Sequence, residues 1–198
     1  KAAKPDMIAL TGDIVDEDHD SISSVEDLLK GIKDLAPIYF VTGNHELTSL
    51  AATQYQELLA LFQKYGVTDL DNDSVKLKKG GQSITLYGRQ YFSQYLTDSL
   101  PIASDKDFDI LLYHGSDNFK EIAPYHYDLI LSGHAHGGIV RLPILGGIFG
   151  NDGTFFPEYA GGEYTIGDAT LISSRGLGDA SIPRFNNPPE LVVIKLNP

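Results

Sequence analysis

Four short apolar runs in this chain end at an aspartate, an asparagine or a histidine, and no other sequence feature constrains the fold as strongly. The runs cover residues 7–11, 38–42, 108–113 and 129–132. Each has the length and the β-branched or aromatic content of a buried strand. Nearly continuous apolar strands indicate a sheet covered on both faces, and such sheets bind ligands at the carboxyl ends of their strands. We therefore expect the polar residues after the runs to share one rim.

The residues that follow the runs have the chemistry of metal ligands. They are Asp13, Asn44, His114, His134 and His136. Imidazole is the commonest neutral metal ligand, and carboxylate or amide oxygens suit harder cations. Glycines on both sides of the His-Ala-His segment let the backbone turn tightly, so that both rings can face one centre. A single His-x-His pair proves little, but four converging runs predict a metal site.

The order of these blocks resembles the calcineurin-like metallophosphoesterases. Four of that family's five signature blocks are recognisable as Gly-Asp-Ile-Val-Asp at 12–16, Gly-Asn-His-Glu at 43–46, His114, and Gly-His-Ala-His at 133–136. The tail resembles a bacterial subgroup of phosphohydrolases that are often membrane-anchored, through residues 137–143, 174–178 and 188–191. The family's opening block, an Asp-x-His pair on its first strand, does not precede Gly12.

The resemblance implies a dinuclear centre with two divalent metal ions. Such a pair needs a bridging ligand, and the two carboxylate oxygens of Asp13 suit that role. By resemblance, Asn44, His114 and His134 complete one metal site with Asp13, and His136 serves the other. Nitrogen and oxygen ligands without sulfur suit Mn, Fe, Zn or Co.

Three further residues of the signature blocks have roles that the resemblance implies. His45 is expected to contact phosphate and protonate the leaving oxygen, with Glu46 orienting its ring and raising its basicity. A histidine that merely caps the loop is the alternative. Asp16 is expected to support the ligand loop without binding metal itself.

Arginines in the last third of the chain are candidates for substrate contact, because guanidinium groups match phosphate oxygens. They are Arg141, Arg175 and Arg184. An arginine that bridges two loops is an equally good interpretation of each.

Helical and strand patterns fill the rest of the chain. A capping box of Ser23 and Glu26 opens a helix expected to run to about Leu35, and a second apolar stripe from Tyr55 ends at Gly66. Further helices are expected at 91–100 and 117–123, and a long loop with a hairpin at 146–167. Strands are expected at 67–70, 75–79, 82–87, 169–173 and 191–196.

Alternating strands and helices followed by strands indicate an α/β or α+β fold. The resemblance narrows this to a two-sheet β-sandwich flanked by helices, with its first strand missing. Without a linker or repeat, residues 1–198 are expected to form a single, N-terminally incomplete domain.

Composition excludes several classes of function. The absence of cysteine rules out thiolate metal sites and cysteine nucleophiles. A net charge of −12 disfavours non-specific binding to nucleic acid. No apolar run approaches the roughly 20 residues that cross a bilayer. The resemblance places the parent protein at the cell membrane through an N-terminal anchor; without that anchor a cytoplasmic protein is expected.

The sequence therefore predicts a phosphoester substrate and metal-dependent hydrolysis of phosphate mono- or diesters by the full-length protein. A non-catalytic binding module that keeps the fold, or a truncated inactive fragment, is the alternative. Because the Asp-x-His block is absent, this chain is expected to hold at most one metal ion and to show little activity. The uncovered strand edge also predicts a strand-mediated oligomer.

Overall fold

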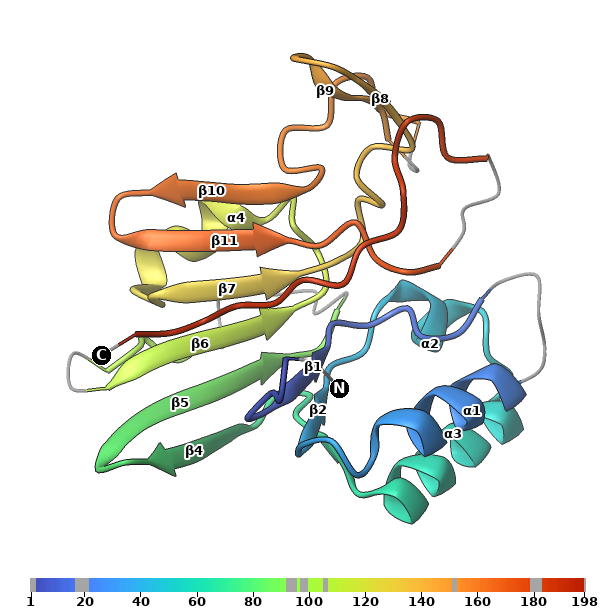
Figure 1. The fold of residues 1–198 in the computed structure, drawn as a ribbon, viewed down its shortest axis with the longest axis vertical. Coiled ribbons are helices and arrows are strands. Elements are labelled where there is room, and N and C mark those ends of the chain that lie inside the picture. Colours follow the sequence, from blue (N-terminus) through green and yellow to red (C-terminus); the bar gives the residue numbers. More distant parts are fainter. Residues whose placement is uncertain are drawn as a thin grey trace.

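The computed structural model describes residues 3–16, 22–91, 96, 100–104, 107–150, 153–178 and 183–197. Two sheets pack face to face with helices outside them (Figure 1). The smaller sheet has the order β1-β2-β3, with all neighbours parallel. Its strands are β1 (Ile8–Leu10), β2 (Ile38–Phe40) and β3 (Val67–Asp69).

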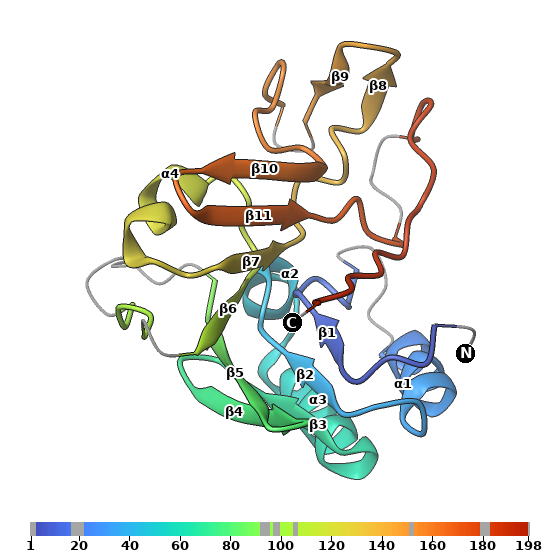
Figure 2. The same cartoon turned by 60° about the vertical axis from the view of Figure 1, so that its left-hand side comes forward.

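The larger sheet has six strands in the order β10-β11-β7-β6-β5-β4. The four inner strands, β11, β7, β6 and β5, run parallel, while β4 and β10 pair antiparallel at the edges. The strands are β4 (Ser74–Lys79), β5 (Gln82–Arg89), β6 (Phe108–Tyr113), β7 (Leu129–Ser132), β10 (Gly162–Ile166) and β11 (Ala169–Ser173). A separate hairpin of β8 (Val140–Leu142) and β9 (Gly146–Phe149) projects beyond β10 (Figure 1 and Figure 2).

Helices cover the outer faces of both sheets. The small sheet is covered by α1 (Ser23–Ile32) and α3 (Ala52–Tyr65), while the short α2 (Asn44–Thr48) follows β2. The large sheet is covered by α4 (Phe119–Ile122), which continues into the 3-10 turn η1 (Ala123–Tyr125). No helix among the described residues is long and apolar enough to span a membrane.

Three apolar clusters hold these layers together. The central one lies between the two sheets and contains Tyr39 and Val41 from the small sheet and Leu86, Ile110 and Leu112 from the large one. Each fully buried side chain of this size stabilises the fold by about 1.5–3 kcal/mol. The packing of sheet on sheet brings the carboxyl ends of β1 and β2 to those of β6 and β7.

Most predicted elements are confirmed. The four apolar runs form β1, β2, β6 and β7, and α3 ends at Gly66 with a left-handed φ of 70°. The expected helix at 117–123 is found as α4 and η1, and the stretch 146–167 holds β9 and β10, which belong to two hairpins. Of the helix expected at 91–100, only residues 91, 96 and 100 are described, so that prediction lies largely outside the described residues.

The predicted start of α1 is wrong. Ile22 occupies the N-cap position and no side chain caps the helix, so Ser23 and Glu26 do not form a capping box. The Glu26 carboxylate instead accepts hydrogen bonds from Lys64 Nζ and Tyr65 Oη of α3, both at 2.8 Å. The Glu26 side chain, which the local sequence pattern assigned to the helix cap, therefore joins α1 to α3 instead. The helix also ends at Ile32, before Leu35.

The predicted strand at 191–196 is also wrong, because this segment joins no sheet of the described residues. Its large apolar side chains remain open to solvent, with Leu191 77% and Val193 67% exposed. The segment has strand-forming composition but pairs with no strand of the described residues.

This exposed apolar segment leads us to expect self-association. Unpaired β-prone segments and open edges such as that of β1 pair with other chains, so the protein should form dimers at micromolar concentration. Val193→Lys should shift it toward monomer in light scattering, because a charge disfavours burial of the segment. Ile102→Lys, which changes a side chain that is 72% exposed elsewhere, is the control. Monomers at all concentrations would contradict this expectation.

Candidate metal centre

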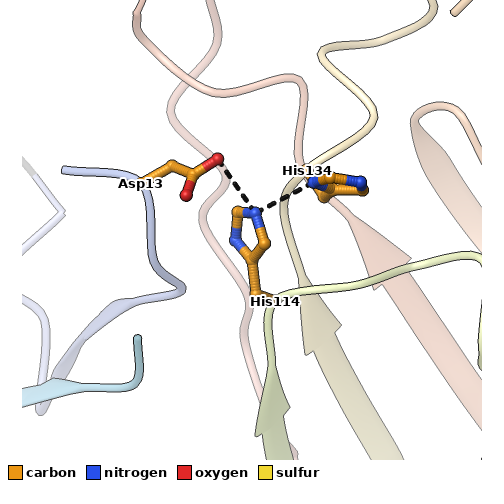
Figure 3. A group of neighbouring side chains, drawn as sticks. All are labelled: Asp13, His114 and His134. Carbon is orange, nitrogen blue, oxygen red and sulfur yellow. Dashed lines mark hydrogen bonds and ion pairs between the residues drawn. The ribbon is translucent and has the colours of Figure 1, made fainter. Parts of the chain in front are cut away.

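Four loops deliver polar side chains to one rim between the sheets. Asp13 follows β1, Asn44 opens α2 after β2, His114 directly follows β6, and His134 lies two residues after β7. Figure 3 shows the carboxylate of Asp13 and the rings of His114 and His134 pointing toward one another. The predicted convergence of these four residues is therefore found. It arises because β1 and β2 end at one edge of the small sheet, β6 and β7 end at one edge of the large sheet, and the packing of the two sheets brings these edges together.

The centre of this cluster is the Nε2 atom of His114. It lies 3.0 Å from Asp13 Oδ2, 3.1 Å from Asn44 Oδ1 and 3.1 Å from His134 Nδ1. One ligand atom from each of Asp13, His114 and His134 lies within 4.8 Å of the others. Four potential donor atoms from four loops thus face one small volume.

The hydrogen bond made by His114 Nδ1 indicates what the space between the four side chains can bind. The ring is 1% exposed, and its Nδ1 lies 2.7 Å from the carbonyl oxygen of Thr11, which can only accept a hydrogen bond. Nδ1 therefore carries a proton whether the ring is neutral or charged. When the ring is neutral, the lone pair of Nε2 faces the other three side chains. Lone pairs that converge without protons between them repel one another unless a cation lies among them. The donor set of two nitrogens and two oxygens fits a divalent metal ion.

Asp13 and His114 stabilise each other's charge. Burial opposes ionisation of both groups, but their hydrogen bond and opposite charges outweigh it. The pKa of Asp13 consequently lies below its ordinary value and the pKa of His114 above its own. The site thus favours a carboxylate paired with positive charge.

Backbone strain is concentrated at this rim. Asp13, His134 and His136 adopt left-handed φ angles of 51°, 66° and 48°, which cost non-glycine residues about 1–3 kcal/mol each. Gly12 has a φ of 84°, and a Cβ at this position would lie 2.5 Å from the backbone nitrogen of Gly43. Only glycine permits the loops after β1 and β2 to approach this closely.

The buried carboxylate of Glu46 holds these two loops together. Its Oε2 accepts the backbone N–H groups of Gly43 at 2.7 Å and Asp13 at 2.9 Å. Its Oε1 accepts those of Ile14 at 2.8 Å and Val15 at 3.3 Å. Burial and the charge of Asp13 raise the pKa of Glu46, while the amide hydrogen bonds oppose this shift. The orientation of the His45 ring by Glu46 stays a prediction.

His45 lies beside the cluster without being one of its central atoms. Its backbone N–H donates to Asp13 Oδ1 at 2.9 Å, and its ring Nε2 lies 3.8 Å from Asp13 Oδ2. The side chain is 21% exposed, so a bound substrate can reach it. Asp16, the predicted supporting residue, is exposed, and its role stays a prediction.

His136 is separate from the group formed by Asp13, His114 and His134. Its Nδ1 is buried and has no hydrogen-bond partner among the described residues. Burial and the nearby charge of Arg184 lower the pKa of His136 to about 4. The ring is therefore neutral at pH 7 and keeps a lone pair for a ligand, but its assignment to a second metal stays a prediction.

The three candidate arginines all donate hydrogen bonds to other groups of the protein. Arg175 donates from its backbone N–H, Nε and a terminal nitrogen to Glu190 at 2.9, 2.8 and 2.5 Å. Arg141 donates to the carbonyl oxygen of Gly137 at 2.6 Å, and Arg184 donates to that of Arg175 at 2.8 Å. The bonds to Glu190, fifteen residues away, support the bridging interpretation for Arg175. Contact of the three side chains with phosphate stays a prediction.

The contact of Tyr91 with a candidate ligand was not predicted from the sequence. The aromatic residues of 91–100 suggested either the lining of a pocket or packing, with packing preferred, and the hydroxyl of Tyr91 lies 3.3 Å from His134 Nε2. The available signal was its position, since Tyr91 closely follows β5, the neighbour of β6 in the large sheet.

Removing the Glu46 carboxylate should destabilise the fold. Glu46→Ala leaves four backbone N–H groups without their acceptor, so the free energy of unfolding should fall by about 3 kcal/mol in urea titrations. Glu46→Gln should have a stability between those of wild type and Glu46→Ala, because its amide nitrogen would face backbone N–H donors while its amide oxygen could still accept. The control, Glu57→Ala on the exposed side of α3, should change stability by less than about 0.5 kcal/mol. Equal stability of the two alanine variants would show that Glu46 does not hold the loops.

Comparison with known proteins gives a family match over most of the chain. Residues 1–138 match the family model described as calcineurin-like phosphoesterase. The chain is 30% identical to the uncharacterized metallophosphoesterase YkuE of Bacillus subtilis (strain 168), over 98% of this chain and 68% of that protein. It is 27% identical to the phosphodiesterase YaeI of Escherichia coli (strain K12), over 98% of this chain and 71% of that protein.

Two solved structures share the fold. The sulfate thiohydrolase SoxB of Thermus thermophilus matches with a TM-score of 0.50 and 16% identity, covering 84% of this chain and 33% of that one. The phosphopantetheinyl hydrolase of Mycobacterium tuberculosis matches with a TM-score of 0.52 and 9% identity, covering 84% of this chain and 77% of that one. At these identities the likeness concerns architecture alone.

Proposed function

Because the chain belongs to the calcineurin-like phosphoesterase family, we propose that the full-length protein hydrolyses phosphate monoesters or diesters at a dinuclear metal centre. Membership of the family supports phosphoester hydrolysis in general. The observation that carries the proposal is the meeting of Asp13, Asn44 and His134 at His114 Nε2, at 3.0–3.1 Å. The phosphodiesterase name of the Escherichia coli relative is the reason to include diesters.

The metals are proposed to be divalent ions of Mn, Fe, Zn or Co. When bound, such ions polarise a phosphoryl oxygen, lower the pKa of a water molecule and neutralise developing charge. Asp13, Asn44, His114 and His134 would hold one ion. Asp13 and His136 would contribute to the other, and the buried, unprotonated ring of His136 supports that role. Since this set is small, the residues present here should hold only the first ion tightly.

The protein's own groups would position the ester and supply a proton. Asn44 directs its amide oxygen at His114, which leaves its NH2 group able to donate to a phosphoryl oxygen. His45 is proposed to protonate the leaving oxygen, because its Nε2 lies 3.8 Å from the Asp13 carboxylate and its side chain is partly open to solvent. A proton delivered there avoids release of an unstabilised alkoxide.

Variants should separate metal ligands from the proton donor. In the full-length protein, Asp13→Ala, Asn44→Ala or His134→Ala should abolish Mn²⁺-dependent hydrolysis of p-nitrophenyl phosphate and bis-p-nitrophenyl phosphate, with loss of bound metal. His45→Ala should keep metal near the wild-type content and lower kcat, by about 100- to 10,000-fold for an alkyl phosphoester. Loss of metal from His45→Ala as complete as from His134→Ala would remove the division of roles. Metal bound by wild type without any hydrolysis would favour a binding module.

The leaving group provides an independent test of His45. General acid catalysis matters most when the leaving oxygen is strongly basic. His45→Ala should therefore slow hydrolysis of alkyl phosphoesters much more than that of nitrophenyl esters, as steady-state rates across a substrate series would show. A uniform loss across the series would exclude His45 as the proton donor.

A further inference from the structure

We propose that Tyr91 is the positioning residue that orients His134 for metal binding, an inference that rests on the metal site proposed above. Tyr91 is 8% exposed and lies two residues beyond the end of β5. Its hydroxyl oxygen is 3.3 Å from Nε2 of His134, whereas the other ring nitrogen, Nδ1, faces His114 at 3.1 Å. The phenol therefore contacts the ring nitrogen that does not face the other ligands.

The aromatic ring of Tyr91 also packs against both histidines. Its centroid lies 5.0 Å from that of His114 in an edge-to-face arrangement at 84°, and 5.2 Å from that of His134 at 43°. Gly115 makes room for this ring, since a Cβ there would lie 2.8 Å from Tyr91 Cε2. The ring thus limits how far either imidazole can rotate.

The two histidines face the site through different nitrogens, and each has its other nitrogen held. His114 faces the site through Nε2, while the carbonyl oxygen of Thr11 holds Nδ1. His134 faces it through Nδ1, so a metal-binding His134 must carry its proton on Nε2. The Tyr91 oxygen is placed to accept that proton's hydrogen bond. Thr11 and Tyr91 therefore fix tautomer and orientation for one ligand each, and such partners raise metal affinity.

The chain leading to Tyr91 is tied to the loop that carries another ligand. The Asp71 carboxylate accepts the backbone N–H of Thr42 at 2.9 Å and its hydroxyl at 2.7 Å. It also accepts Nε2 of Gln90 at 3.3 Å. Thr42 lies two residues before Asn44, and Gln90 immediately precedes Tyr91. Asp71 thereby links the residue before Tyr91 to the loop that carries Asn44.

A matched pair of variants separates this role from packing. Tyr91→Phe removes only the hydroxyl and keeps the ring packed against both histidines. Tyr113→Phe is the control, because Tyr113 is also buried and its ring lies 5.8 Å from that of Tyr91. The Tyr113 hydroxyl, however, donates to Asn118 at 3.3 Å. Both variants should unfold near the wild-type temperature without metal.

Two measurements on the full chain decide the matter. In calorimetric titration with Mn²⁺, Tyr91→Phe should raise the dissociation constant about 10- to 100-fold, and Tyr113→Phe should leave it unchanged. In nuclear magnetic resonance spectra of the Zn²⁺-loaded wild type, His134 should carry its proton on Nε2 and exchange it slowly with water. Tyr91→Phe should speed that exchange, which a purely structural role would not do.

The outcomes also separate this inference from the metal site itself. If His134→Ala loses Mn²⁺ while Tyr91→Phe binds it as tightly as wild type, Tyr91 does not position His134 and the metal site stands. Equal weakening by Tyr91→Phe and Tyr113→Phe would likewise overturn the inference. Undiminished Mn²⁺ binding by His134→Ala would overturn both proposals. A His134 proton found on Nδ1 in the Zn²⁺-loaded wild type would refute the orientation without recourse to any variant.

Discussion

The contact of His114 with the loop after β1 is the interaction on which the rest of the site depends. One buried imidazole from the large sheet contacts two groups of the small-sheet loop, Thr11 O at 2.7 Å through Nδ1 and Asp13 Oδ2 at 3.0 Å through Nε2. The ring thereby joins the carboxyl edges of two sheets that otherwise meet through apolar side chains. The carbonyl oxygen of Thr11 accepts the hydrogen bond of the Nδ1 proton, which leaves Nε2 to face the ligand set. The same His114 contacts therefore join the two sheets and orient a candidate metal ligand.

The structure around the candidate metal site compensates for the strain and the charge of the loops that carry Asp13 and His134. Left-handed backbone at Asp13 and His134 together costs a few kcal/mol, and converging lone pairs add repulsion in the absence of a cation. The Glu46 carboxylate offsets part of this cost through four backbone hydrogen bonds that lock the loops after β1 and β2. A bound cation would remove the repulsion. Metal binding should accordingly stabilise the fold as well as equip it for hydrolysis.

The ligand set could be predicted from sequence because its logic is topological. Within each sheet the parallel strands end at one edge, so the residues after β1 and β2 lie together, and so do those after β6 and β7. The packing of the two sheets then brings these edges to each other. The parts that failed depend on partners distant in sequence. Glu26 was expected to cap its own helix, but Lys64 and Tyr65 of α3 bind it.

Partners far away in the chain explain the other differences too. Residues 191–196 have strand propensity, but a strand also needs a partner strand, and this segment pairs with none among the described residues. The amide contacts of Glu46 come from two loops about thirty residues apart, and no local pattern encodes them. Tyr91 belongs to no recognisable motif, and a buried tyrosine after a strand usually serves packing.

The location of bound metal tests the central claim most directly. Anomalous scattering from crystals of this chain grown with Mn²⁺ should show one strong peak, contacted by Asp13, Asn44, His114 and His134, and weak or absent density near His136. A principal peak elsewhere, or one that Asn44 and His114 do not touch, would contradict the assignment of the site. Two peaks of equal strength would contradict the claim that this chain holds only one ion tightly.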